Sequence, residues 1–256
     1  MKDKKLESTS ELRFEFQKKN VTSRYIDGEI VLNSRFTGMQ DIFLNETASF
    51  MFNIMQKYGE MSVSDMANEV LAEYNIDDKE RVAVDVLNTL YSLWKVAVIR
   101  WISVNPFALE PVSCGRGEII KITHDSVADV LEFMKNAEQH IDPYEMKTGE
   151  DEFVLKLIHN VTPTYAYLED GKIACIMSVL RIDQSPIVRI GHRENHDELR
   201  TLLKHIVSNE EELKIILFRI LSDKENEKEL ATQLGFRFAG KLKKETSEGD
   251  VDLYVY

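Results

Sequence analysis

The residues with the clearest chemical potential form a short run in the second half of the chain. His192, Glu194 and His196 occupy alternate positions there. This order differs from the His-Glu-x-x-His metal motif, because the glutamate is displaced and the run enters a helix rather than lying inside one, so no metal site is expected. His192, at the mouth of an expected strand, could act as a general base. It could instead offer positive charge to a phosphate together with Arg189 and Arg193, or be a solvated loop histidine.

The two cysteines offer little further chemistry. Cys114 and Cys175 are too few and too far apart for a disulfide framework, and the chain has no Cys-x-x-Cys spacing. Cys175 falls in the middle of an expected strand, where a small buried apolar residue is the default interpretation. This cysteine usage fits a reducing, cytoplasmic setting.

Composition and charge exclude several classes of protein. The chain has 256 residues, 43% of them hydrophobic, which suits two domains of about 100 to 150 residues. It carries 32 basic and 44 acidic residues, a formal charge of −12, so nucleic acid is not an expected partner. It holds no apolar signal region and no run of about 20 uncharged apolar residues, so no membrane partner is expected either.

A break in the pattern divides the chain into two parts. Residues 105–117 contain Pro106, Pro111, Gly115 and Gly117 among weakly patterned neighbours. We expect this stretch to be a linker between a domain at 1–104 and a domain at 118–256. Through residue 110 the chain has 13 basic and 17 acidic residues, and beyond it 19 and 27, so neither half is a basic module.

The first half predicts strands followed by helices. Strand-like runs occupy residues 12–17, 29–33 and 40–44, with Asp27-Gly28 as a turn. Asn45 can cap a first helix, Ser62 or Ser64 a second, and a third is expected at 79–95, before a strand at 96–101. Together these elements predict a small winged-helix domain. The third helix carries only three cations against two carboxylates, which disfavours DNA binding.

Three features of the first half belong together: the sequence FLNETA at 43–48, the segment SVSDMANEVLAEY at 62–74 and the helix around Asp85-Val86-Leu87. With them the chain resembles the PqqD-like family over about residues 25–101. That resemblance implies capture of a precursor or leader peptide during maturation of a ribosomally synthesised peptide. The peptide would add as a strand against residues 40–44, with its side chains in the cleft toward the third helix. The implied contact residues are Gln40, Asp41, Ile42, Phe43, Leu44, Val82 and Val86. In the competing interpretation, residues 45–47 only cap a helix, and Ile42 and Leu44 only fill the core.

The second half predicts a mixed α/β sheet with helices on its faces. We expect strands at 118–123, 164–168, 172–183, 187–190, 214–221, 236–243 and 251–256, and helices at 126–139, 150–161, 195–207 and 226–234. The sequences LEDGKIACIMSV at 168–179 and ELATQLGFRFAGKLKKE at 229–245 resemble the GNAT superfamily of N-acyltransferases over about 118–256.

The GNAT resemblance implies transfer of an acyl group from acetyl-CoA or another acyl-CoA to an amine. The pantetheine would lie along the fourth strand and the pyrophosphate on the loop and helix that follow. In this chain the implied cofactor-binding residues are Ile187, Val188, Arg189, Ile190, Gly191, Arg193, Asn195 and His196, with His192 as the candidate catalytic residue.

The chain departs from the GNAT pattern at this loop. The small residues that let backbone N–H groups close on a pyrophosphate are replaced by Asp197 and Leu199, and Glu194 stands at the basic position. Each close carboxylate would repel a diphosphate by about 1 to 4 kcal/mol. Acidic residues in a first helical turn are also ordinary dipole partners. The tyrosine that serves many members as general acid falls on Ala231, so proton delivery has no assigned residue.

Three hypotheses follow for function. The first is a peptide-tethering, acyl-CoA dependent N-acyltransferase, in which the first domain raises the local concentration of the acceptor amine. The second is a catalytically degenerate GNAT-fold binding module or scaffold, favoured by Glu194, Asp197, Leu199 and Ala231. The third, a transcriptional regulator, would need a basic DNA-binding face that the composition does not show.

Overall fold

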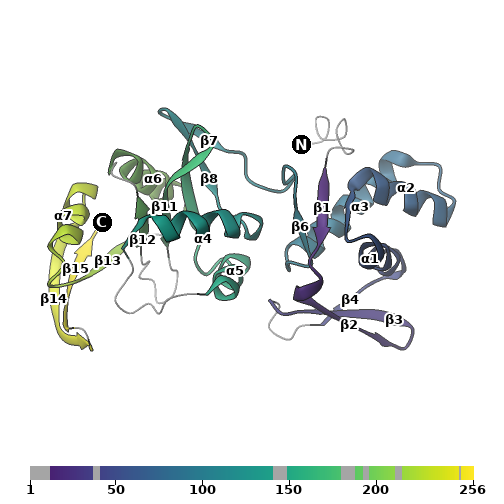
Figure 1. Cartoon of the computed structure of the whole chain (residues 1–256), viewed down its shortest axis with the longest axis horizontal. Coiled ribbons are helices and arrows are strands. Elements are labelled where there is room, and N and C mark those ends of the chain that lie inside the picture. Colours follow the sequence, from purple (N-terminus) through teal and green to yellow (C-terminus); the bar gives the residue numbers. More distant parts are fainter. Residues whose placement is uncertain are drawn as a thin grey trace. The chain divides into compact units, whose positions relative to one another are not determined.

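The computed structural model describes residues 12–36, 41–140, 149–179, 188–192, 196–210, 215–247 and 249–256, with the backbone alone for 138–140 and 188–192. The chain divides into two compact units, residues 1–108 and 109–256. Figure 1 shows the helices and strands of each unit.

The first unit contains the three expected helices, and each begins at a side-chain cap. Asn45 Oδ1 accepts a hydrogen bond from the Ala48 N–H at 2.8 Å, and Ser62 and Asp78 accept equivalent bonds at the next two helices. Such caps satisfy N–H groups that have no partner within the helix. The elements in chain order are β1 (Arg13–Phe16), η1 (Lys18–Asn20), β2 (Val21–Ile26), β3 (Glu29–Ser34), β4 (Asp41–Phe43), α1 (Glu46–Tyr58), β5 (Glu60–Ser62), α2 (Val63–Tyr74), α3 (Lys79–Trp94) and β6 (Ile99–Trp101).

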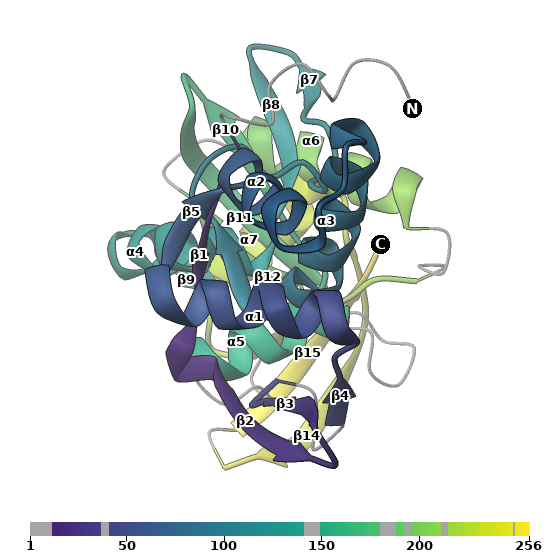
Figure 2. The same ribbon diagram turned by 90° about the vertical axis from the view of Figure 1, so that its right-hand side faces the viewer.

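Two three-stranded antiparallel sheets frame these helices, in the orders β5-β1-β6 and β2-β3-β4. The sequence did not predict β2, which pairs with β3 across a turn at Asp27 and Gly28, both with positive φ (51° and 91°). This conformation matches the twist of a two-residue hairpin, which explains the glycine. Figure 2 shows α1 between the β2-β3-β4 sheet and the other two helices.

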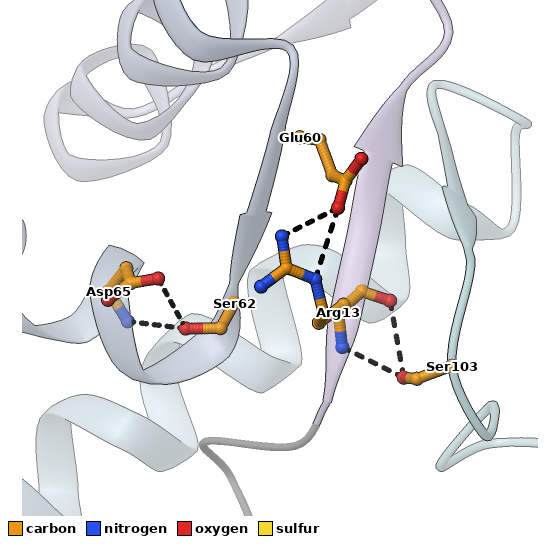
Figure 3. Close-up of polar contacts among 5 residues, drawn as sticks. All are labelled: Arg13, Glu60, Ser62, Asp65 and Ser103. Atoms are coloured by element: carbon orange, nitrogen blue, oxygen red, sulfur yellow. Dashed lines mark hydrogen bonds and ion pairs between the residues drawn. The ribbon is translucent and has the colours of Figure 1, made fainter.

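Polar contacts hold the N-terminal strand β1 at the centre of its sheet. The Arg13 guanidinium donates to Glu60 on β5 at 2.6 and 3.1 Å, and the Arg13 N–H donates to the Ser103 hydroxyl at 2.8 Å (Figure 3). Next to this, Ser62 both donates to the Asp65 carboxylate and accepts from its N–H. Strand β1 is therefore tied to segments distant in sequence.

The core of the first unit is a single apolar cluster beneath the helices. Phe52 of α1 is 1% exposed and meets Phe16 edge to face, with ring centroids 5.5 Å apart. Met51, Met66 and Leu90 are fully buried in the same cluster. The three helices thus bury one face each, as their apolar periodicity predicts.

The second unit is a mixed α/β structure, as expected, but its described strands form two antiparallel sheets instead of the one mixed sheet that the sequence predicted. A six-stranded sheet has the order β7-β8-β10-β11-β12-β9, and a three-stranded sheet has the order β13-β15-β14. The elements are β7 (Val112–Cys114), β8 (Gly117–Lys121), η2 (His124–Ser126), α4 (Val127–Asn136), β9 (Glu138–His140), α5 (Glu150–Ile158), β10 (Thr164–Glu169), β11 (Lys172–Val179), β12 (Val188–His192), α6 (His196–Asn209), β13 (Leu217–Leu221), α7 (Glu225–Leu234), β14 (Arg237–Thr246) and β15 (Gly249–Val255).

Alternating residues of the larger sheet enter two separate cores. Cys175 and Met177 of β11 join a cluster with α6, whereas Ile176 between them joins a cluster with α4 and α5. Successive strand residues point to opposite faces, so helices cover both faces of this sheet. The continuous apolar run of β11 reflects this burial on both sides.

A buried carboxylate joins the elements of the smaller sheet. Asp252 of β15 accepts a hydrogen bond from Ser222 at 2.6 Å and pairs with Lys228 of α7 at 3.2 Å and Lys241 of β14 at 3.5 Å. Burial alone would raise the pKa of Asp252, but the Ser222 hydrogen bond and the two ammonium groups lower it overall. The carboxylate therefore stays ionised and holds α7, β14 and β15 together.

The stretch expected to be a linker, residues 105–117, contributes to both units. Phe107 packs on Tyr91 and Trp101 of the first unit, with ring centroids 4.7 and 5.8 Å away. Strand β7, which the sequence did not predict, pairs with β8 of the second unit. No helix within the described ranges is long and apolar enough to cross a membrane.

Candidate functional site

Strand β4 of the first unit carries the residues expected to receive a peptide. It lies at the edge of its sheet and pairs with β3 alone among the described strands. Phe43 is 62% exposed, Asp41 forms an ion pair with Arg24 of β2, and Ile42 is half-buried. Leu44 is buried in the core, and Gln40 lies outside the described residues.

The hydrogen-bonding direction of β4 follows from one contact. The Leu44 N–H donates to the Ile30 carbonyl at 3.0 Å, toward β3. Because these groups alternate along a strand, the N–H groups of Phe43 and Asp41 point to the other side. That side is the open edge of the sheet, so an added strand would find two outward donors there.

The two valines expected to line the peptide cleft lie in the core instead. Val82 is 3% exposed and Val86 is 1% exposed, and both pack within the apolar cluster of the first unit. They are therefore not surface contacts in this structure. What α3 exposes is a second apolar stripe, in which Val84 (43% exposed) and Tyr91 (40% exposed) flank half-buried Leu87. The spacing of three and four residues was the signal for this stripe.

Strand β12 and helix α6 of the second unit bring together most of the residues expected to bind a cofactor. Val188, Arg189, Ile190, Gly191 and His192 all lie on β12, and α6 begins four residues later at His196. Ile187, Arg193, Glu194 and Asn195 lie outside the described residues. The catalytic role of His192 remains a prediction.

Strand β12 is paired on both sides at residues 190–192. One edge pairs with β11 along its whole length, and the other pairs with β9 in the register Ile190 to His140, Gly191 to Gln139 and His192 to Glu138. The sequence did not predict β9. A pantetheine chain that used the backbone of β12, as the GNAT resemblance implies, would have to displace β9 from residues 190–192.

The first turn of α6 is acidic and already engaged. Asp197 pairs with Arg200 at 3.0 Å, and the ring of His196 hydrogen-bonds to the Gln233 side chain of α7. Leu199, which stands where the resemblance requires a small residue, is fully buried in the core. The acidic first turn and the buried Leu199 are poorly suited to bind the pyrophosphate of acyl-CoA. The pairing of β9 with residues 190–192 of β12 also leaves less backbone open to the pantetheine.

Behind the first turn of α6 lies a small group of titratable side chains. Burial raises the pKa of the Tyr167 phenol, and the Glu198 carboxylate raises it further. The Tyr167 hydroxyl donates to the Cys114 carbonyl at 2.9 Å. Burial also raises the pKa of Cys175 to about 12, again with help from Glu198. Neither group is poised as a nucleophile at neutral pH.

This environment predicts that Cys175 is chemically silent. In the folded protein at pH 8, a disulfide reagent such as dithionitrobenzoate should label half-buried Cys114 and leave Cys175 unmodified, because only the thiolate reacts. Mass spectrometry of the labelled protein, compared with a Cys114→Ser variant, measures this. Fast labelling of the Cys114→Ser variant without denaturant would contradict the buried, high-pKa assignment.

Helix α7 provides no acid for the reaction that the resemblance implies. Ala231, at the position of the GNAT tyrosine, is fully buried in the core. Proton transfer at this site therefore has no assigned protein donor.

Within the described part of the chain, no group of three or more His, Cys, Asp or Glu side chains could hold a metal ion.

Comparison with known proteins gives structural likenesses only. No protein-family model and no curated protein matches the chain. Among solved structures, the chain is similar to the ribosomal-protein-S5-alanine acetyltransferase of Vibrio fischeri, with 14% identity over 58% of this chain and 96% of that one, at a TM-score of 0.46. It is also similar to a probable acetyltransferase from Staphylococcus epidermidis, with 15% identity, 55% and 98% coverage and a TM-score of 0.45. The spermidine N-acetyltransferase of Vibrio cholerae matches with 14% identity, 55% and 93% coverage and a TM-score of 0.44.

Proposed function

We propose that this protein is a peptide-tethering N-acyltransferase. The first unit holds a precursor or leader peptide, and the second transfers an acyl group from acyl-CoA to an amine of that peptide. The observation that carries the first part is the open edge of β4, with the outward N–H groups of Asp41 and Phe43 and the exposed Phe43 ring. An extended peptide adds to such an edge by main-chain hydrogen bonds.

The second part is supported by the order of elements around β12. This strand lies between β11 and β9 in a sheet of antiparallel strands whose faces are covered by α4 and α5 on one side and α6 on the other. Helix α6 starts just after β12, so the strand leads directly to a helix N-terminus. Acyl-CoA, when bound, supplies an activated acyl group, which the amine takes up as an amide while the thiol leaves.

The chain's own contribution to this reaction would be mainly positioning. Tethering the peptide on β4 raises the effective concentration of the acceptor amine at the second unit. Because Ala231 offers no hydroxyl, the proton lost by the amine would reach the leaving sulfur through solvent. Such an enzyme is expected to be slow with a free amine and faster with a tethered one.

A second candidate function is a binding module that has lost catalysis. It is favoured by the pairing of β9 along β12, which covers the edge that a pantetheine chain would use. Buried Leu199 and the acidic first turn of α6 point the same way. In this case the second unit would serve as a scaffold in the same chain as the peptide-binding unit.

Calorimetric titration separates the two candidates. Acetyl-CoA and a longer acyl-CoA are titrated into the folded protein, and saturable binding in the micromolar range supports the acyltransferase. If neither ligand gives a heat of binding, and circular dichroism shows that the sample is folded, the result favours the binding module.

Peptide capture is tested on β4 itself. Phe43→Pro removes an outward N–H without disturbing the bonds of β4 to β3, and should weaken a peptide selected from a display library by about fivefold or more. Phe43→Leu keeps the N–H and serves as the matched control. Equal affinity of both variants would show that the peptide does not pair with this edge.

A further inference from the structure

A surface groove in the second unit lies next to the first turn of α6, since two of its lining residues, Arg200 and Gln233, contact Asp197 and His196. None of the described residues that line it was expected above to bind a cofactor or a peptide. It has a volume of about 640 Å³ and lies where α6, the end of α7, the start of β14 and the end of β15 meet. That volume is in the range of pockets that hold small molecules. The side chains that give it its character are Arg200, Lys204, Arg237, Phe238 and Tyr256.

The charge of this groove is opposite to that of the chain. Three cations line it, and none of its described lining residues is an Asp or Glu, although the chain has 44 acidic against 32 basic residues. Arg200 and Lys204 stand one helical turn apart on α6, and Arg237 of β14 lines the same groove. Such a convergence of like charge in an acidic protein favours an anionic ligand.

The three cations are not equally engaged. Arg200 pairs with Asp197 at 3.0 Å and donates to the Gln233 carbonyl at 2.8 Å, which fixes its guanidinium. Lys204 and Arg237 are both exposed, and neither has an ion-pair partner among the residues that the structure describes. Two cations therefore remain available to an incoming phosphate or carboxylate.

Aromatic rings form the other part of the groove. Phe238 is 58% exposed and Tyr256 is 37% exposed, and they contact Tyr254 and Phe236 respectively, with ring centroids 5.7 and 5.3 Å apart. These contacts fix both rings while leaving part of each accessible. An exposed ring next to cations suits a planar ring attached to a phosphate.

Glycine keeps the floor of the groove open. Gly235 ends α7 with φ of 97°, and a Cβ atom there would approach the Tyr256 ring to 3.3 Å. A side chain at this position would strain the backbone and press on the ring that lines the groove. The glycine thus preserves both the turn and the space beside Tyr256.

The neighbouring strand disfavours an extended peptide as the occupant. Strand β14 is an edge strand, but its register shifts between Phe238 and Gly240, directly beside the groove. Such an irregularity interrupts the even row of donors and acceptors that an added strand requires. A compact ligand fits the observations better than a long acidic segment.

We propose that this groove binds a nucleotide, with its phosphate on Lys204 and Arg237 and its base against Phe238. The chemistry recognised, a phosphate next to a planar base, could come from a free mononucleotide or from the nucleotide end of a larger molecule such as coenzyme A. The proposal does not depend on acyl transfer by the second unit.

The test is calorimetry on the full chain with AMP, adenosine 3′,5′-bisphosphate, coenzyme A and adenosine. The phosphate-bearing ligands should bind and adenosine should not. The double variant Lys204→Glu with Arg237→Glu should lose at least about tenfold in affinity, and Phe238→Ser should lose severalfold. All three positions are exposed, so folding is expected to be kept and is checked by circular dichroism.

Lys243→Glu is the matched control, because Lys243 is an exposed cation of the same strand that does not line the groove. It should leave affinity within about twofold. Equal weakening by Lys243→Glu, no effect of the double variant, or no binding of any phosphate-bearing ligand would each overturn the proposal. The proposal would also be overturned if a Glu-Tyr peptide displaced AMP and bound more tightly than AMP does. That result would mean that the groove binds peptides.

The ligands also distinguish the two sources. If the protein binds AMP at least as tightly as coenzyme A, and the double variant abolishes the binding of AMP, the groove is a site for a free nucleotide. A coenzyme A affinity well above that of AMP, also lost in the double variant, identifies the nucleotide end of the larger molecule. Coenzyme A binding that the double variant leaves intact would support the proposed function and overturn this inference.

Discussion

Replacing Phe52 with alanine is expected to lower the free energy of unfolding of the first unit by about 3 to 5 kcal/mol. Phe52 is 1% exposed and contacts Phe16 edge to face, so the substitution removes a large side chain from the centre of the core. The core of this unit contains residues of the first unit alone. A loss of this size would consume much of the stability of a domain of about 100 residues.

Tyr58→Ala is the matched control for this substitution. Tyr58 lies on the same helix and is 51% exposed, so its removal should change stability by about 0.5 kcal/mol or less. Urea unfolding followed by hydrogen exchange, which reports the two units separately, measures both variants. Similar losses for the two variants would mean that Phe52 is not at the centre of this core.

Freeing the edge of β12 is expected to strengthen acyl-CoA binding. Replacing both Gln139 and His140 with proline removes the one N–H of the two that β9 donates to β12, whichever residue carries it. Loss of this bond, worth about 1 kcal/mol, should raise the affinity for acetyl-CoA by about fivefold. Calorimetry under identical conditions gives the ratio.

The control keeps the backbone donors in place. Gln139→Ala with His140→Ala retains both N–H groups and should leave the affinity within about twofold of the parent chain. If the proline variant binds acetyl-CoA more weakly than the alanine variant, β9 supports the site instead of covering it. If neither variant binds acetyl-CoA, the result favours the second candidate function, a binding module that has lost catalysis.

Local signals in the sequence predicted the helices well. Asn45, and Ser62 as one of two candidates, were expected to cap helices, and they begin α1 and α2 in the structure. The third helix was expected from residue 79, where α3 begins, and Asp78 caps it. In the second unit the order of strands and helices also matched expectation, apart from the short additions β7 and β9. Both kinds of signal depend on near neighbours in the chain.

The elements that were missed are defined by their pairing and not by a pattern of their own. All but one of the residues of β2 are exposed, so no apolar alternation marks it, and hairpin pairing with the adjacent β3 defines it. Strand β9 has three residues and exists through its pairing with β12, some 50 positions away in the sequence. A short segment carries no periodicity from which such pairing can be inferred.

The candidate site residues show the same limit. Periodicity placed Val82 and Val86 on an apolar face of α3, but it could not tell whether that face meets the core or a peptide. The structure shows that they meet the core and that Val84 and Tyr91 are exposed. The surface groove of the second unit escaped notice because Lys204 of α6, Arg237 of β14 and Tyr256, which follows β15, are far apart in the sequence.

The position of β1 sets an order of events during synthesis of the chain. Its residues pair with β5 near position 61 and with β6 near position 100. Helices and the β2-β3 hairpin can form as each emerges from the ribosome, because their contacts are local. Strand β1 can pair with β5 once Met61 has been released, but its other edge must wait for β6 and Trp101, which also completes the ring contact with Phe14. The sheet around the N-terminal strand is therefore among the last parts of its own unit to be completed, and a nascent chain paused before residue 101 leaves one edge of β1 open.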